Sequence, residues 1–90
     1  MPPEKQSSCE FQGSLTTEAR TRIARALTGA GADLRTLERT GRSAYRLTFT
    51  LPEEAAREDH LRAVVEVQEA LDDLGHACKL WEPPAEEPLP

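Results

Sequence analysis

Apolar residues along the chain recur with two different spacings. Between residues 16 and 30 they lie three or four positions apart, as on one face of an amphipathic helix: Ala19, Ile23, Ala26, Leu27 and Ala30. A second stripe with helical spacing predicts another helix over 53–74: Leu61, Val64, Val67, Leu71 and Leu74. Residues 45–51 alternate strictly instead, so this segment predicts a strand with one buried side.

Polar residues and irregular spacing mark the boundaries between these elements. Thr16 or Thr17 is suited to cap the first helix, because a threonine hydroxyl accepts a hydrogen bond from the first helical turn. Residues 40–42 predict a tight turn between two strands. Leu34 and Leu37 are out of step with strict alternation, which predicts a bulge or an edge position there. Weaker strand patterns complete the set at 7–12, 33–40 and 76–81.

The resulting order is strand, helix, strand, strand, helix, strand, the βαββαβ order of ferredoxin-like domains. It predicts an α+β two-layer sandwich with an antiparallel sheet in the order 4-1-3-2 and both helices on one face. Strand alternation predicts the residues that face the helices: Cys9, Phe11, Tyr45, Leu47, Phe49, Cys78 and Leu80. It assigns the other residues to the open face of the sheet: Ser8, Glu10, Gln12, Arg46, Thr48, Thr50, Lys79 and Trp81.

Composition narrows the classes of partner. The chain has 90 residues, enough for one domain, and a net charge of −5, which argues against binding a phosphate backbone. RNA-recognition domains of this topology stack bases on aromatic residues of the open sheet face, and the outward positions of the first and third strands carry none. We therefore expect no nucleic-acid partner.

The ends of the chain differ in composition from its centre. Residues 1–6 predict a flexible polar lead, residues 7–82 a single domain, and residues 83–90 a disordered tail rich in proline and glutamate. Neither an apolar leader nor a run long enough to span a membrane is apparent. Arginine outnumbers lysine nine to two, as in GC-rich genomes. We expect a bacterial, cytoplasmic protein with no membrane partner.

Few residues in the sequence are candidates for redox chemistry, metal binding or catalysis. Cys9 and Cys78 fall on strands that neighbour each other in the predicted sheet and face the same side, which leaves two alternatives: buried free thiols, or a disulfide or redox pair. His60 and His76 are separated by most of the second helix, so they cannot share a metal ion and are expected to be structural or exposed to solvent. No catalytic motif is present, and we expect neither a cofactor nor an enzyme.

The segment IARALTGAGADLRTLE, residues 23–38, resembles the first helix and second strand of ACT domains, which are small regulatory modules. The resemblance implies a scaffold that self-associates. It also implies an effector site near the loop between the first strand and first helix, here Gly13, Ser14, Leu15 and Thr16. This loop keeps a glycine but lacks the family's Asp-Arg-Pro-Gly signature, so association ranks ahead of effector binding.

The leading hypothesis is therefore a non-enzymatic interaction or regulatory module that binds a partner protein, itself, or both. Association is expected to use the edge of the second strand, the first helix, or the open sheet face around Trp81. The candidate interface residues on that face are Arg46, Thr48, Lys79 and Trp81. One alternative is a sensor that holds an amino-acid-like effector at a dimer interface. Another is a small redox protein or enzyme that uses the two cysteines.

Overall fold

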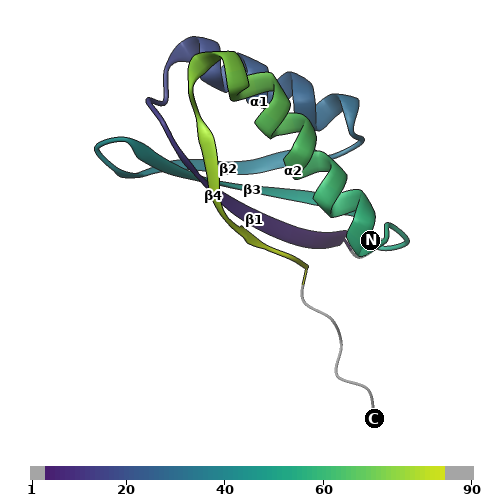
Figure 1. Ribbon diagram of the computed structural model, residues 1–90. Coiled ribbons are helices and arrows are strands. Elements are labelled where there is room, and N and C mark those ends of the chain that lie inside the picture. The colour runs from purple at the N-terminus through teal and green to yellow at the C-terminus, as the bar shows by residue number, and fades with distance from the viewer. Residues whose placement is uncertain (1–3, 85–90) are drawn as a thin grey trace.

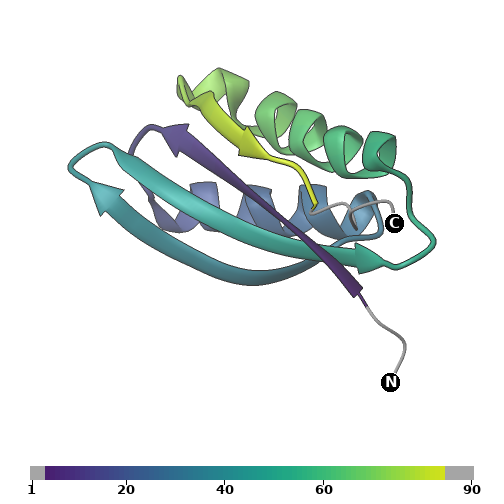
Figure 2. The ribbon, with the colours of Figure 1, turned by 90° about the horizontal axis from the view of Figure 1, so that it is seen from below.

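The computed structural model describes residues 4–84, which form one antiparallel sheet covered on one face by two helices (Figures 1 and 2). The elements in chain order are β1 (Glu4–Gln12), α1 (Thr17–Gly29), β2 (Asp33–Gly41), β3 (Ala44–Pro52), α2 (Arg57–Leu71), the short 3-10 helix η1 (Asp72–Leu74) and β4 (Ala77–Glu82). The strand order is β2-β3-β1-β4, which is the predicted order read from the opposite edge. The fold is thus α+β and ferredoxin-like, as predicted.

Two elements begin three or more residues away from their predicted starts. β1 begins at Glu4, so residues 4–6 belong to the sheet and not to a flexible lead. α2 begins at Arg57 instead of Glu53, because residues 53–56 form a turn after Pro52. The Asp59 carboxylate accepts the N–H of Ala56 (2.8 Å) and so caps the helix start. Residues 1–3 and the part of the predicted tail from 85 onward lie outside the described residues.

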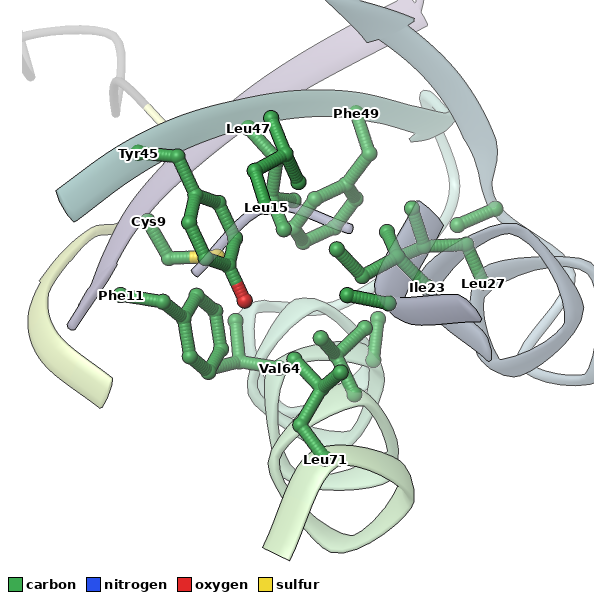
Figure 3. Packing of buried hydrophobic residues seen from close by; sticks show 14 of the residues in the cluster. Cys9, Phe11, Leu15, Ile23, Leu27, Tyr45, Leu47, Phe49, Val64 and Leu71 are labelled. Atoms are coloured by element: carbon green, nitrogen blue, oxygen red, sulfur yellow. The ribbon is translucent and has the colours of Figure 1, made fainter. Parts of the chain in front are cut away.

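The core lies between the sheet and the helices. In Figure 3, Phe11 and Tyr45 point from the sheet towards α2, and their rings stack with centroids 5.9 Å apart. The predicted stripe of α1 is confirmed at Ala19, Ile23 and Leu27, which are completely buried. Aliphatic residues make up most of the remaining core, as expected for a chain with few aromatic residues.

The register of β2 explains why its leucines break the alternation. Leu34 pairs with Phe49 and Thr36 pairs with Thr48, which leaves Arg35 as an extra residue on the edge strand. Because of this bulge, Leu34 and Leu37 both pack against the core. The predicted bulge is confirmed.

A second bulge, in β4, contradicts the predicted faces of that strand. Phe11 pairs with Cys78, but Glu10 pairs with Leu80, so Lys79 is the extra residue. One inserted residue reverses the facing of everything after it. As a result, Leu80 lies on the open face with 46% of its surface exposed, while Trp81 packs against the core.

The side of α2 that faces the core also differs from the prediction. Leu61 was predicted to be buried but is 44% exposed, and His60 is completely buried in its place. A hydrogen bond joins His60 Nδ1 to Ser7 Oγ on β1 (2.5 Å), and the imidazole lies 6.0 Å from the Phe49 ring. The buried stripe therefore runs through His60, Ala63, Val64, Val67 and Leu71.

Gly13 provides a test of the packing at the end of β1. Its φ angle is +153°, and a Cβ there would lie 2.4 Å from the imidazole ring of His76. We expect Gly13→Ala to lower the free energy of unfolding by about 1–3 kcal/mol, because the ring must move and the backbone is strained. Gly29→Ala is the matched control, since it meets no atom within 4 Å and should stabilise α1 by about 0.5–1 kcal/mol. Urea denaturation of both variants measures the difference, and equal stabilities would contradict this account.

His60 makes stability depend on pH. Burial lowers the pKa of its imidazole, the Lys5 ammonium lowers it further, and Asp59 partly offsets both. Nε2 is buried with no hydrogen-bond partner among the described residues, so a proton added there would be an unpaired buried charge. The unfolded chain, with a histidine pKa of about 6.5, takes up the proton first as the pH falls.

The free energy of unfolding should therefore decline as the pH falls from about 7 towards 5. His60→Gln, which does not titrate, should show a flatter profile over this range even if it is less stable throughout. Thermal unfolding at several pH values compares the two slopes. Equal slopes would show that His60 is not the group responsible.

Candidate functional site

The open face of the sheet carries polar side chains that pair with one another. Arg46 on β3 approaches Glu10 on the neighbouring strand β1 (3.9 Å) and reaches across β1 to form an ion pair with Glu82 on β4 (3.1 Å). Ser8 and Thr48 share a hydrogen bond across β1 and β3 (3.2 Å). A partner on this face would have to replace bonds that already exist, so these groups offer it little net binding energy.

The four residues predicted as an interface do not form one surface. Arg46 and Thr48 lie on the open face, and Thr48 is only 8% exposed. Lys79 is the bulge residue of β4, and Trp81 lies on the helix side of the same strand. The open face of the sheet therefore lacks the one aromatic residue predicted for it, because Trp81 lies beside α2 instead.

The loop between β1 and α1 uses its hydrogen-bonding groups within the fold. The Thr16 hydroxyl accepts the N–H of Ala19 (3.1 Å), which confirms Thr16 as the cap of α1. The Gly13 N–H donates to the Ser43 carbonyl (2.7 Å), and Leu15 is buried. These contacts explain the loop's conformation without a ligand, and effector binding at Gly13, Ser14, Leu15 and Thr16 stays a prediction.

The two histidines are structural in different parts of the core. His60 binds Ser7, as described above, and His76 Nδ1 lies 2.7 Å from the Tyr45 hydroxyl, with which it shares a hydrogen bond. Within residues 4–84, no group of three or more histidine, cysteine, aspartate or glutamate side chains is placed to hold a metal ion. The same residues include no helix long and apolar enough to cross a membrane.

Cys9 and Cys78 are both free thiols. They are not directly opposite each other, because Cys9 pairs with Trp81 and Cys78 with Phe11. Burial raises the pKa of the Cys9 thiol well above its usual range, and the nearby Cys78 raises it further. Burial also raises the pKa of Cys78. Both therefore stay protonated at neutral pH, whereas a cysteine nucleophile needs the thiolate.

A different surface combines apolar side chains with a hollow. Leu61 and Val65, one turn apart on α2, are 44% and 45% exposed. Beside them is a hollow of about 360 Å³ whose lining has more apolar than polar surface. Its lining residues are Arg57, Glu58, Leu61 and Trp81. We call the surface formed by Arg57, Leu61, Val65 and Trp81 the α2–β4 surface.

Two contacts hold this surface together. The guanidinium carbon of Arg57 lies 5.7 Å from the centroid of the Trp81 ring, in cation–π geometry. Farther along α2, the Gln68 side chain donates to the His76 carbonyl (2.8 Å) and accepts the N–H of Cys78 (2.5 Å). These hydrogen bonds hold this side of α2 against β4 (Figure 2). Leu61 lies next to that contact, since it lines the hollow together with Trp81.

Sequence reasoning placed Trp81 on the wrong face and Leu61 in the core, so it did not detect this surface. The signal that was available is the spacing of His60, Val64, Val67 and Leu71, which is as regular as the stripe that starts from Leu61. Leucine is more hydrophobic than histidine, and this favoured Leu61 as the buried residue. The hydrogen bond of His60 with Ser7 on β1 places His60 in the core instead.

Two other hollows are more polar than the α2–β4 surface. A groove of about 460 Å³ lies between the helices and is lined by Arg22, Arg25, Ala26, Glu66, Glu69 and Ala70. Arg22 already binds Glu18, Asp73 and the Ala70 carbonyl there. The other hollow, of about 390 Å³, lies beside the sheet and is lined by Glu4, Lys5, Gln6, Ser8, Glu82 and Pro83. Of these three hollows, the one beside Leu61 has the most apolar lining, and Leu61 and Val65 are exposed there. We therefore take the α2–β4 surface as the candidate site.

No family model matches the chain, and neither does any curated protein. Among solved structures, the chain is similar to a C-terminal segment of the alpha subunit of aIF2 from Pyrococcus abyssi, at 17% identity and a TM-score of 0.50. That match covers 94% of this chain and 53% of the segment, so the chain spans about half the segment's length. The chain is also similar to AtUAH in complex with glyoxylate, at 14% identity, a TM-score of 0.47, and coverage of 91% of this chain and 28% of that one. The likeness to the aIF2 segment agrees with the ferredoxin-like fold and concerns the fold alone.

The burial of the thiols predicts a difference in their reactivity. In the native protein, iodoacetamide should alkylate Cys78, which is partly exposed, well before Cys9, which is 1% exposed. Cys9 should react at a comparable rate only after unfolding in denaturant. Mass spectrometry of digested samples gives the rate for each site. Rapid alkylation of native Cys9 would contradict its protonated, buried state and revive a redox role.

Proposed function

We propose that this chain is a non-enzymatic interaction module, regulatory in the manner of ACT-like domains, that binds a protein through the α2–β4 surface. The observation that carries the proposal is the exposure of Leu61 and Val65 beside the hollow at Trp81. Contiguous exposed apolar surface that is rimmed by polar or charged residues is typical of protein-interaction sites.

The composition of the surface suits a protein partner. Covering the exposed parts of Leu61 and Val65 contributes about 1 kcal/mol each. Tryptophan and arginine are the residues most enriched among those that dominate binding energy at interfaces, and Trp81 and Arg57 lie at the hollow. The rim is charged, with Glu58 on one side. An apolar centre with a charged rim is the usual anatomy of such contacts.

The two alternative functions have less support. An effector sensor needs free donors at the Gly13–Thr16 loop, and the donors of Gly13 and Ala19 are already bonded within the fold. A redox protein needs a thiolate, and the pKa values of Cys9 and Cys78 are raised. The open sheet face has no aromatic platform for bases, because Trp81 turns away from it.

Site-specific photo-crosslinking tests the proposal in the protein's native cell. A photoreactive amino acid in place of Leu61 in the full chain should yield covalent adducts with protein. The same amino acid in place of Leu80, which is equally exposed but lies on the open face, is the control and should yield few. No protein adduct from position 61, or equal yields from the two positions, would overturn the proposal.

A further inference from the structure

We propose that the first residues of β1 bind an extended, acidic segment of a partner protein, which adds to the sheet as a short strand antiparallel to β1. We call residues 4–7 the β1 edge. Addition of a strand to a sheet edge is a common mode of peptide recognition, in which main-chain hydrogen bonds supply much of the affinity. This site is separate from the α2–β4 surface, so the inference does not rest on the proposed function.

The sheet is incomplete at the β1 edge. β1 pairs with β3 along its whole length, Glu4–Gln12, whereas its pairing with β4 begins only at Ser8, opposite Glu82. β1 therefore extends past the end of β4 and has a neighbouring strand on one side only (Figure 2). A hollow of about 390 Å³ lies at this position, lined by Glu4, Lys5, Gln6, Ser8, Glu82 and Pro83.

The alternation of hydrogen bonds shows which backbone groups face this hollow. Gly13 continues the β1–β3 register opposite Ser43 and donates its N–H to the Ser43 carbonyl (2.7 Å). In an antiparallel pair, every second residue bonds to the same neighbouring strand. Lys5 and Ser7 are thus the residues of the β1 edge that bond to β3. Gln6, between them, directs its N–H and C=O to the other side, where β4 has ended.

Two prolines prevent β4 from continuing along the β1 edge. The register of Ser8 with Glu82 would set Pro84 opposite Gln6, where a hydrogen-bonded pair needs a backbone donor. Proline has no N–H, and Pro83 precedes it without one either. Within residues 4–84, no backbone hydrogen bond joins Gln6 to the residues that follow β4. Its donor and acceptor are therefore available to another chain.

The remaining edges of the sheet are irregular. On β4, the N–H of Cys78 is bonded to Gln68, and Lys79 forms a bulge. On β2, the register shifts at Arg35 and again at Thr40. Bulges are among the devices that prevent strands from pairing between molecules. The pairing of β1 with β3 has no such shift, so the β1 edge offers a regular template.

The charges at the hollow favour an acidic segment. The Glu4 carboxylate is already paired with Arg35 (2.5 Å), and the Glu82 carboxylate with Arg46 (3.1 Å). Lys5 has no ion-pair partner within the part of the chain that the structure describes, residues 4–84. An aspartate or glutamate opposite Lys5 in the added strand would form a cross-strand pair of opposite charges, which is stabilising.

The same lysine disfavours a second copy of this chain as the occupant. If the β1 edges of two copies overlapped fully about a two-fold axis, Gln6 of each would lie opposite Glu4 of the other. The two Lys5 residues would then lie directly opposite each other, and like charges in this position are destabilising. We therefore assign the β1 edge to a segment of a different protein.

Selection from a phage-displayed library of random 12-residue peptides on the full chain tests the inference. Enriched peptides should contain aspartate or glutamate within an extended, proline-free stretch. In the free chain, the Gln6 amide should exchange with solvent faster than those of Lys5 and Ser7, which are bonded to β3. An enriched peptide at ten times its Kd should slow exchange of the Gln6 amide about tenfold, as measured by NMR.

Gln6→Pro should abolish peptide binding, because it removes the donor that faces the hollow. The variant should fold, since that N–H makes no bond to β3 and proline is tolerated at such positions. Gln6→Thr keeps the donor, is the matched control, and should bind as the original chain does. Lys5→Ala should weaken acidic peptides by about two- to fivefold. Circular dichroism and thermal unfolding establish that each variant is folded.

Several outcomes would overturn the inference. They include a library that yields no binding peptide, a Gln6 amide that does not slow when a peptide binds, and binding unaffected by Gln6→Pro. A dimer that Gln6→Pro abolishes would identify a second copy as the occupant instead. A Gln6 amide that is slow in the free chain and becomes fast on deletion of residues 85–90 would identify the chain's own tail. Peptide binding lost in Leu61→Lys would move the site to the α2–β4 surface, whose proposed role is tested separately by cross-linking from position 61.

Discussion

The hydrogen bond between Ser7 and His60 sets the rotation of α2, and the exposed surface of the domain depends on that rotation. A buried serine hydroxyl on β1 needs a partner, and His60 provides it at 2.5 Å. Satisfying this pair turns His60 inward and turns Leu61, about 100° farther round the helix, towards solvent. The apolar patch on α2 is thus a consequence of satisfying a polar pair in the core.

The bulge at Lys79 complements this rotation. Without it, Trp81 would lie among the ion pairs of the open face, and the hollow beside Leu61 would lack its aromatic wall. With it, Trp81 lies next to the Arg57 guanidinium, and Leu80 is displaced to the open face. One inserted residue in a strand therefore moves the indole from a polar surface to an apolar one.

The rest of the molecule is consistent with the proposed role in protein contact. Its open face is covered by paired polar groups, its thiols are protonated, and its histidines are held in the core by Ser7 and Tyr45. A ferredoxin-like fold by itself implies no particular activity, so the inference of function rests on the α2–β4 surface alone. Exposed aliphatic surface on a chain with so modest a core is a cost to solubility, and a partner that covers it removes that cost.

The sequence by itself determined the order of the elements, the sheet order, the stripe of α1 and the bulge in β2. The elements, the stripe of α1 and the bulge in β2 follow from local spacing, which repeats every two residues in a strand and every three to four in a helix. The sheet order follows from the βαββαβ order of those elements. Only the tertiary structure decided which side of α2 is buried and which face of the sheet the β4 residues after Lys79 occupy. Both choices depend on a partner distant in sequence: Ser7 for the helix, and the pairing of Glu10 with Leu80 for the strand. Local periodicity carries no information about such distant contacts. The candidate site lies where helix α2 meets strand β4, so the sequence alone did not predict it.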